Sequence, residues 1–394
     1  MKIVEINSGN EGSTGNVMLG IAKVARSEGD IVYTFGPRNR RQRKHVREHT
    51  FFGCYLERKP SAILNTIFGT EGSLNIISTF CLLKQIDNLS PDIIHLHNLH
   101  TNYINVQMLF DYIKRKNIRT IWTLHDCISF TGHCPNFIVS ECNKWKSGCY
   151  ACPSYKEYPK SLVDTSKKMW ERRKKLSDQI ENLTIVVPSQ WLGNLVKQSF
   201  LKMHSVYLIN NGIDLSIFYP RIGTFRKKYA LEKKFVILAV AFNWGYLKGL
   251  DRIENLAAKL DDRFQLVVVG IAKNQIISKN IISIERTYNQ EELAEIYSES
   301  DVLFNPTRED NFPTVNLEAL ACGTPILSYG AGGSAEAFDD TCGLVVNDDN
   351  VCTVLDKLYI KNFDSVSCIK RSQKYRQEDK FREYVKLYHC ANGE

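Results

Sequence analysis

The segment from Asn305 to Ser328, NPTREDNFPTVNLEALACGTPILS, holds the residues best suited to chemistry. An apolar run leads into acidic side chains, and Pro313 is a residue type favoured at the first position of a helix. The free N–H groups and the positive end of such a helix bind anions. Acidic side chains beside it can accept hydrogen bonds from sugar or ribose hydroxyls. The order strand, acids, helix, glycine and strand is therefore typical of a pocket for a nucleotide linked to a sugar.

Two halves of the chain alternate short apolar runs with stretches of helical period, which predicts parallel sheets covered by helices. The runs expected as strands are almost continuously apolar because both faces of such a sheet are buried. In the first half they are residues 2–6, 31–35, 93–96, 120–124 and 183–188. In the second half they are residues 235–241, 265–270, 281–284, 302–305, 325–328 and 343–346. Helical period is clear at residues 16–27, 102–116, 190–197, 250–260, 290–299 and 314–321.

Five fragments of the chain resemble, in order, the signature of glycosyltransferase family 4, whose members are retaining enzymes with the GT-B fold. They are GNEGSTG at 9–15, TLHD at 123–126, NGID at 211–214, KG at 248–249 and the segment 305–328. Within the last fragment, Glu318 stands at the second acid of the family's pair, and Asp310 stands eight residues earlier. The family usually has a glutamate at that first position, and here Glu309 lies beside Asp310. Which of the two acids contacts the donor sugar is left open.

The resemblance implies an α/β fold of the GT-B type, with two Rossmann-like doubly wound domains facing across a cleft. Residues 1–215 would form an N-terminal acceptor domain with a cysteine-rich insertion at 127–165. Residues 216–375 would form a C-terminal domain that binds the nucleotide sugar. A C-terminal helix at 376–394 would pack back on the N-terminal domain.

The resemblance also implies roles for individual residues. Asp310 or Glu309 would bind sugar hydroxyls, and Glu318 would bind the ribose hydroxyls. Lys248, with the N–H groups near 312–315, would stabilise the departing diphosphate, and His125 would face the reacting sugar. An arginine that the family often places just before the lysine is replaced here by FNW at 242–244. The donor-binding residues expected are Gly15, Asn211, Gly212, Lys248, Glu309, Asp310, Asn311, Phe312, Pro313, Thr314, Val315 and Glu318.

Five of the twelve cysteines lie between Cys127 and Cys152, in a segment where the alternation of strands and helices breaks down. A C-x-x-C pair at 149–152 is common in zinc sites, and a bound metal would stabilise a loop that lacks a core. Reduced thiols packed among aromatic side chains are the alternative interpretation. We expect no cofactor for catalysis, and a structural zinc would be held by Cys134, Cys142, Cys149 and Cys152, with His133 or Cys127 as substitutes.

Length and composition are those of an ordinary soluble protein, with 394 residues, 43% of them apolar and 24% charged. There is no basic segment followed by a long apolar core at the start, which predicts a cytoplasmic protein. The net charge of +8 is concentrated at 38–47 and 167–175. Either segment could contact anionic lipid at the inner face of the membrane, or be solvated. Nucleic-acid binding is not expected because aromatic residues are not interleaved with the basic ones.

The expected function is transfer of a sugar from a nucleotide-sugar donor to a saccharide acceptor, with retention of configuration. The resemblance suggests bacterial exopolysaccharide, colanic-acid or O-antigen synthesis, with an acceptor linked to a lipid diphosphate. One alternative is a catalytically weak scaffold that binds nucleotide sugars, favoured by Asp310 and by the missing arginine. The other alternative is a GT-B-fold epimerase.

Overall fold

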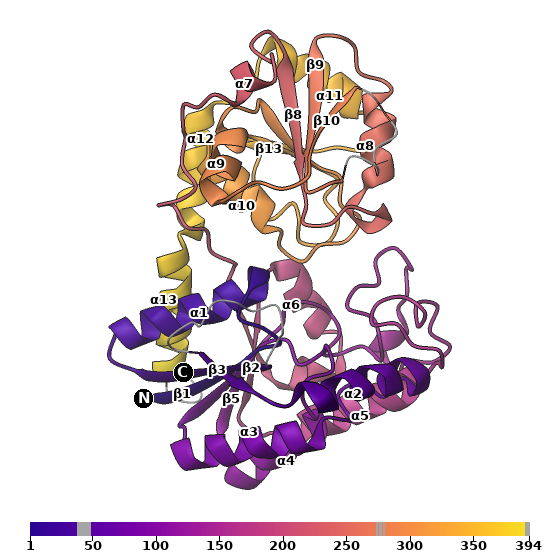
Figure 1. Cartoon of the computed structure of the whole chain (residues 1–394), viewed down its shortest axis with the longest axis vertical. Helices are drawn as coiled ribbons and strands as arrows, with labels where there is room; N and C mark the ends of the chain where they lie inside the picture. The colour runs from indigo at the N-terminus through magenta and orange to yellow at the C-terminus, as the bar shows by residue number, and fades with distance from the viewer. Residues whose placement is uncertain (38–48, 273–274, 276–277, 279, 391–394) are drawn as a thin grey trace. The chain divides into compact units, whose positions relative to one another are not determined.

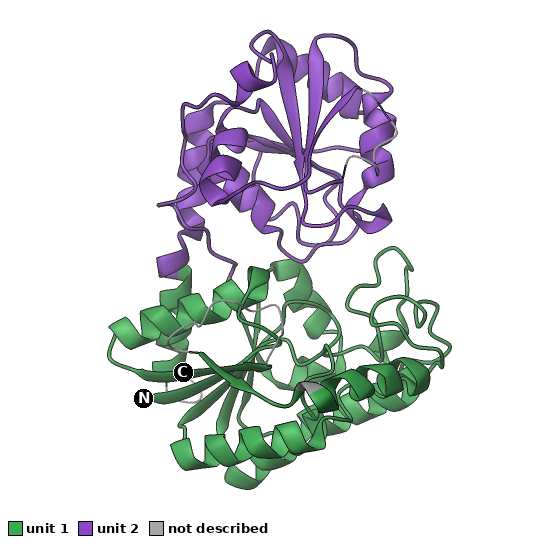
Figure 2. Ribbon diagram, viewed as in Figure 1, with its two compact units in different colours: residues 1–209, 380–394 green, residues 210–379 purple. Residues whose placement is uncertain are grey.

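The computed structural model describes residues 1–37, 49–272, 275, 278 and 280–390. The chain divides into two compact units, residues 1–209 with 380–394 and residues 210–379 (Figure 2). Each unit is built on one parallel sheet with helices packed on it (Figure 1). The expected α/β class is confirmed. The basic segment 38–47 lies outside the described residues, so its expected contact with lipid stays a prediction.

Unit 1 has a seven-stranded sheet in the order β3-β2-β1-β4-β5-β6-β7. Each neighbouring pair of strands is parallel, so all seven carboxyl ends meet at one edge. The elements are β1 (Lys2–Ile6), α1 (Gly12–Ser27), β2 (Ile31–Pro37), β3 (His49–Phe52), α2 (Tyr55–Phe68), α3 (Ile76–Leu89), β4 (Ile93–Leu96), α4 (Val106–Lys116), β5 (Arg119–Thr123), α5 (Ser166–Asp178), β6 (Leu183–Val187), α6 (Gln190–Val196) and β7 (Ser205–Leu208). The short 3-10 helices η1 (Lys144–Lys146) and η2 (Phe200–Met203) complete it.

Unit 2 has a six-stranded sheet in the order β10-β9-β8-β11-β12-β13, again with parallel neighbours. Its elements are α7 (Phe225–Lys228), β8 (Phe235–Val240), η3 (Tyr246–Lys248), α8 (Leu250–Ala257), β9 (Phe264–Val269), β10 (Ile281–Ile284), α9 (Gln290–Ser298), β11 (Val302–Asn305), α10 (Thr314–Ala321), β12 (Ile326–Ser328), β13 (Gly343–Val345), α11 (Val351–Ile360), α12 (Ser365–Ser372) and η5 (Gln373–Tyr375). The final helix α13 (Gln377–His389) begins in unit 2 and continues in unit 1.

Both faces of each sheet are buried, which explains why the central strands are continuously apolar. In β1, Val4 and Ile6 join the core beneath α3 and α4, whereas Ile3 joins the core beneath α1 and α13. The two edge strands β3 and β7 were not expected. In β7 three of the four residues are exposed, so this strand carries no apolar run in the sequence.

The last helix closes one face of the unit 1 sheet. Phe381 lies over Gly20 of α1, where a Cβ atom would come within 2.1 Å of the Phe381 ring. The Arg119 guanidinium donates to the carbonyls of Leu387 and Tyr388, at 2.7 and 2.6 Å, near the C-terminal end of α13. A cation there complements the negative end of the helix dipole. No helix among the described residues is both long and apolar enough to cross a membrane.

A buried polar chain joins α13 to the sheet. The Tyr388 hydroxyl donates to Oε1 of Glu5 at 3.0 Å and lies 2.7 Å from Nδ1 of His95. Burial raises the pKa of Glu5 to about 8, although the bond from Tyr388 acts in the opposite direction. The Tyr388 hydroxyl therefore supplies a hydrogen bond to a carboxyl group that is fully buried from water.

We expect Tyr388→Phe to lower the free energy of unfolding by about 1–3 kcal/mol, because buried polar atoms of Glu5 and His95 lose their partner. Urea denaturation measures the change, with Tyr288→Phe as the control because Tyr288 is exposed. An unchanged midpoint for Tyr388→Phe would contradict this account of the buried chain.

Candidate functional site

The acidic loop of unit 2 runs from the end of β11 to the start of α10. The side chain of Asn305 donates to Oδ1 of Asn316 at 2.9 Å, and Asn316 donates to the Ser334 carbonyl at 2.7 Å. These buried amides fix both ends of the loop. The helix predicted to start at about Pro313 is α10 (Thr314–Ala321), with Pro313 as its N-cap residue. The first N–H groups of α10 thus follow directly after the acids.

Lys248 and Asp310 are brought together in unit 2. The Lys248 ammonium lies 2.7 Å from Oδ2 of Asp310, and both side chains are partly exposed. The turn that carries Lys248 is fixed by Gly249, whose φ of +79° favours glycine. A Cβ atom on Gly249 would also come within 2.4 Å of the Pro306 carbonyl oxygen. Close contact between two backbone segments therefore places the cation beside the acidic loop.

Arg308 is a residue of this site that the sequence did not single out. Its guanidinium donates to both carboxylate oxygens of Asp251, each at 2.7 Å, and lies 3.9 Å from the centre of the Tyr246 ring. Its backbone N–H donates to the Leu247 carbonyl at 2.9 Å. Arg308 therefore holds the turn before Lys248 against the acidic loop. Its position next to Glu309 and Asp310 could have marked Arg308 as a candidate site residue. Its partner Asp251 could not be inferred, because it is distant in the sequence.

Glu318 lies on α10 and is partly buried. The Tyr297 hydroxyl donates to its Oε2 atom at 2.9 Å. Burial raises the pKa of Glu318 to about 7, and hydrogen bonds from Tyr297 and Thr314 oppose the shift. The side chain therefore exchanges a proton near neutral pH, and a ligand that donates hydrogen bonds would favour its ionised form.

The other predicted residues of unit 2 surround the same loop. The Asn211 side chain donates to the Phe312 carbonyl at 3.1 Å. Gly212 lies so close to Gln377 that a Cβ atom would come within 2.5 Å of its Cα. Glu309 is buried, and its carbonyl accepts from the Thr307 hydroxyl at 3.0 Å. Unit 2 therefore brings together the loop, Lys248 and the 211–212 turn, and the remaining predicted residues in it are Asn311, Pro313, Thr314 and Val315.

The two other predicted residues, His125 and Gly15, belong to unit 1. His125 follows β5, and its Nε2 atom lies 3.0 Å from Nδ1 of His97, with the two rings stacked. Burial lowers the pKa of His125 to about 4, so its imidazole is neutral at neutral pH. Gly15 lies in the first turn of α1, where a Cβ atom would come within 2.5 Å of the backbone of Asn10.

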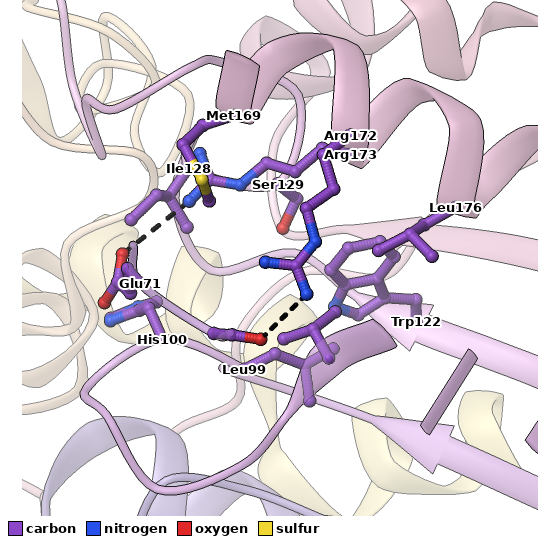
Figure 3. Close-up of a pocket in the computed structure, with 12 residues that line it drawn as sticks. Glu71, Leu99, His100, Trp122, Ile128, Ser129, Met169, Arg172, Arg173 and Leu176 are labelled. Atoms are coloured by element: carbon purple, nitrogen blue, oxygen red, sulfur yellow. Dashed lines mark hydrogen bonds and ion pairs between the residues drawn. The ribbon is translucent and has the colours of Figure 1, made fainter. Parts of the chain in front are cut away.

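A cavity of about 50 Å³ lies in unit 1, lined in part by His100, Trp122 and Ile128 (Figure 3). Figure 3 shows Arg173 directed to Glu71, with the nearest charged atoms 3.6 Å apart. His100, which also lines this cavity, lies 2.9 Å from a carboxylate oxygen of Asp126. The walls are otherwise largely apolar, from Leu99, Val106, Trp122, Ile128, Met169 and Leu176. The cavity therefore combines apolar walls with charged groups at one side.

The basic segment 167–175 was expected as a lipid contact or a solvated surface, and part of it is neither. Arg172 and Arg173 line the cavity, and the Arg173 guanidinium also donates to the Thr131 carbonyl at 2.8 Å. The segment is a helix, so residues on one side of it turn toward the fold while Lys175 stays exposed.

The four cysteines predicted as zinc ligands line one small cavity in the insertion. The sulfurs of Cys134 and Cys152 are 3.7 Å apart, and Cys149 accepts a hydrogen bond from the Gly132 N–H at 3.1 Å. Within the described residues, the one group of three ligand atoms all within 4.8 Å of one another is Glu5, His95 and His97. The four thiols therefore lie in one region, but no three of their sulfurs are all within 4.8 Å of one another. None of the four cysteines forms a disulfide.

Two family profiles match the chain. Residues 15–217 match the family described as Glycosyltransferase Family 4, and residues 222–359 match Glycosyl transferases group 1. A protein of Escherichia coli (strain K12), described as a colanic acid biosynthesis glycosyl transferase WcaC, is 24% identical over 270 residues. That match covers 66% of this chain and 65% of the relative, just under two thirds of its length. An uncharacterised protein in the cps region of Klebsiella pneumoniae is 23% identical over 342 residues, 82% of this chain and 86% of that protein.

Solved structures match the fold over nearly the whole chain. Sucrose-phosphate synthase from Thermosynechococcus elongatus has a TM-score of 0.71 at 16% identity, covering 98% of both chains. Anabaena HepE in complex with UDP has a TM-score of 0.69 at 12% identity, covering 98% of this chain and 99% of that one. Identities this low establish a common fold and nothing finer.

We expect Asp126→Asn to lower the pKa of His100. Burial lowers that pKa, but attraction to Asp126, the hydrogen bond with Asp126 and attraction to Glu71 together outweigh it, so the pKa lies above its ordinary value in the folded protein. Protonated His100 therefore stabilises the fold at low pH, and the contribution is lost as the pH rises through the folded-state pKa. An NMR titration of the histidine ring resonances measures the shift. Asp340→Asn, at an exposed site in unit 2, is the control. Equal midpoints in the wild type and Asp126→Asn would contradict the assignment.

Proposed function

Since this chain belongs to glycosyltransferase family 4, we propose that it transfers a sugar from a nucleotide-sugar donor to a saccharide acceptor with retention of configuration. The family and the GT-B fold expected from the sequence are both confirmed by the matches. The observation that carries the proposed activity is the contact of Lys248 with Asp310 at the start of α10. It sets a cation beside an acid of the loop that leads into α10.

Departure of a nucleoside diphosphate develops negative charge on the diphosphate as the bond to the sugar breaks. The Lys248 ammonium and the first N–H groups of α10 are donors suited to stabilise that charge. In the protein alone, Asp310 supplies the counter-charge for Lys248. When the diphosphate takes that role, the Asp310 carboxylate becomes available to accept hydrogen bonds from sugar hydroxyls. This assigns the sugar contact to Asp310 in preference to Glu309, which is buried.

We assign the ribose to Glu318 and a sugar hydroxyl to His125. The pKa of Glu318, about 7, means that hydroxyl donors from ribose would draw the side chain into its ionised form. His125 is neutral at neutral pH because of its lowered pKa. It would therefore act as a hydrogen-bonding group and not as a cation. Gly15, in the first turn of α1, would let the backbone at Asn10 pack against that helix beside the donor, and Asn211 and Gly212 would support the loop at Phe312.

The acceptor is proposed to bind unit 1, at the cavity lined by His100 and Arg173. His100 lies 2.9 Å from Asp126, the residue that follows His125 in the chain, so the cavity would begin near the reacting sugar. An arginine among apolar walls suits a saccharide carried on a lipid diphosphate. The names of the E. coli and K. pneumoniae relatives support a place in surface polysaccharide synthesis.

We expect Lys248→Ala to lower the rate of transfer by about 10²–10³, or 2.7–4 kcal/mol, because one preorganised donor to the leaving group is lost. Release of nucleoside diphosphate from a panel of UDP- and GDP-linked sugars, with and without saccharide acceptors, measures it. Lys233→Ala is the matched control because Lys233 is an exposed lysine of the same unit. Turnover of Lys248→Ala at the wild-type rate would refute the assignment. Binding of donors without turnover by the wild type would favour the scaffold alternative.

We also propose that Cys134, Cys142, Cys149 and Cys152 hold a structural zinc. Zinc with sulfur ligands at about 2.3 Å has sulfurs about 3.8 Å apart in a tetrahedral site. The 3.7 Å between Cys134 and Cys152 fits one edge of such a site. The insertion holds no strand and one short 3-10 helix among its residues 127–165. Its side chains Phe130, Phe137 and Trp145 are buried in the unit 1 core, and a metal would add to the stability that they supply. The zinc would have no part in the transfer.

We expect elemental analysis of the chain purified under reducing conditions to find about one zinc per chain. Cys149→Ser with Cys152→Ser should remove most of it and lower the melting temperature, because two of four ligands are lost. Cys81→Ser with Cys390→Ser, at two exposed cysteines, is the matched control. Chain without zinc that melts at the same temperature after zinc is added would rule the site out.

A further inference from the structure

The helix α2 has its polar side turned inward and its apolar side turned outward. Ser61 and Asn65 are buried, each with 5% of its surface exposed. Leu56 and Ile63, by contrast, are 81% and 61% exposed, and Leu64, Ile67 and Phe68 are exposed as well. These positions recur at the spacing of one helix face. A surface helix of a globular protein normally has the opposite arrangement.

Hydrogen bonds hold α2 in this orientation. The Asn65 side chain donates to Asn102 and accepts from the Thr70 hydroxyl at 2.8 Å. At the end of the helix, the carbonyl of Thr66 accepts from the Leu162 N–H at 2.7 Å, and the carbonyl of Gly69 accepts from the Thr165 hydroxyl. The inward side is satisfied by polar contacts, so the outward apolar side is a fixed feature of the fold.

The first turns of α3 also carry exposed apolar side chains. Ile77 and Phe80 are 67% and 62% exposed, and Ile76 is exposed too, whereas Ser78 is buried. The Glu57 carboxylate of α2 accepts from the N–H groups of Ile77 and Ser78, at 2.9 and 2.8 Å. The two helices are thereby joined at this point. We call the exposed side chains of Leu56, Ile63, Leu64, Ile67, Phe68, Ile76, Ile77 and Phe80 the α2–α3 apolar face.

Charge on this surface is sparse and positive. Among the described exposed residues of α2 the charged one is Lys59, and Lys84 is exposed one turn beyond Phe80 on α3. The exposed Asp87, one turn further along α3, is paired with Lys116. The Glu57 carboxylate is bound to the start of α3 and is not part of the outer surface. Apolar side chains with lysines beside them match the boundary between acyl chains and anionic headgroups.

We propose that the α2–α3 apolar face binds the surface of an anionic lipid bilayer. The face belongs to the unit proposed to bind the acceptor, and α2 leads through Glu71 into the cavity that holds Arg173. A lipid-linked saccharide would thus meet the protein where its lipid already lies. The link to the acceptor rests on the proposed function, but binding to lipid can be measured without donor or acceptor.

Sedimentation with vesicles of phosphatidylcholine and phosphatidylglycerol tests the proposal on the full chain. Ile63→Ser with Ile67→Ser should lower the partition coefficient about tenfold or more, because two large apolar side chains leave the lipid contact. Ile222→Ser with Ile360→Ser removes two highly exposed isoleucines of unit 2 and should leave binding unchanged. Vesicles of phosphatidylcholine alone should bind the wild type more weakly.

Equal vesicle binding by the wild type and the α2 variant would overturn the proposal. So would light scattering that finds a wild-type dimer and a monomeric variant, with no vesicle binding by either, since a second copy would then cover the face. Melting temperatures equal to the wild type show that the variant is folded. Transfer to a water-soluble saccharide should be unchanged in the variant. If the wild type shows no transfer to the water-soluble saccharide, that result counts against the proposed function and not against lipid binding.

Discussion

The contact between the Lys248 ammonium and the Asp310 carboxylate is the interaction on which the candidate donor site depends. Neither side chain could hold this position alone, because both are long or flexible and partly exposed. The backbone fixes them instead, through the close approach of Gly249 to Pro306 and the attachment of Arg308 to Leu247. An exposed ion pair contributes little to stability. Its importance lies in placing opposite charges beside the start of a helix.

Parallel strands explain why such a site forms at all. Every loop that follows a strand emerges at the same edge of its sheet. The loop after β11 therefore meets the turn after β8, where the Thr307 hydroxyl donates to the carbonyl of Leu247, 60 residues away in the sequence. In unit 1 the same rule brings the residues after β4 and β5 together, as His97 and His125. Burial then sets the protonation state of one group in each unit. It lowers the pKa of His125, so that imidazole is neutral at neutral pH, and it raises the pKa of Glu318 close to neutral pH.

The central strands and the α/β class could be predicted from sequence because two-sided burial leaves an apolar run. The edge strand β7 could not, since its residues are mostly exposed. The segment 305–328 was recognisable as a unit because its groups are close in sequence. The residues that bond to this segment could not be predicted, because packing determines them. Glu318 bonds to Tyr297, and Arg308 bonds to Asp251. Helices α2 and α3 were not predicted from the sequence. Periodicity alone does not show which side of a helix faces the core.

Unit 1 is discontinuous along the chain, because residues 380–389 of α13 cover a sheet whose strands end at Leu208. During synthesis from the N-terminus, the face formed by Ile3, Ile93 and Ile121 therefore stays partly uncovered until all of unit 2 has been made. The first unit to leave the ribosome is thus the last to be completed, and unit 2 can fold before it. In that interval α1 covers part of this face of the sheet, and the rest stays exposed for as long as translation of about 170 further residues takes.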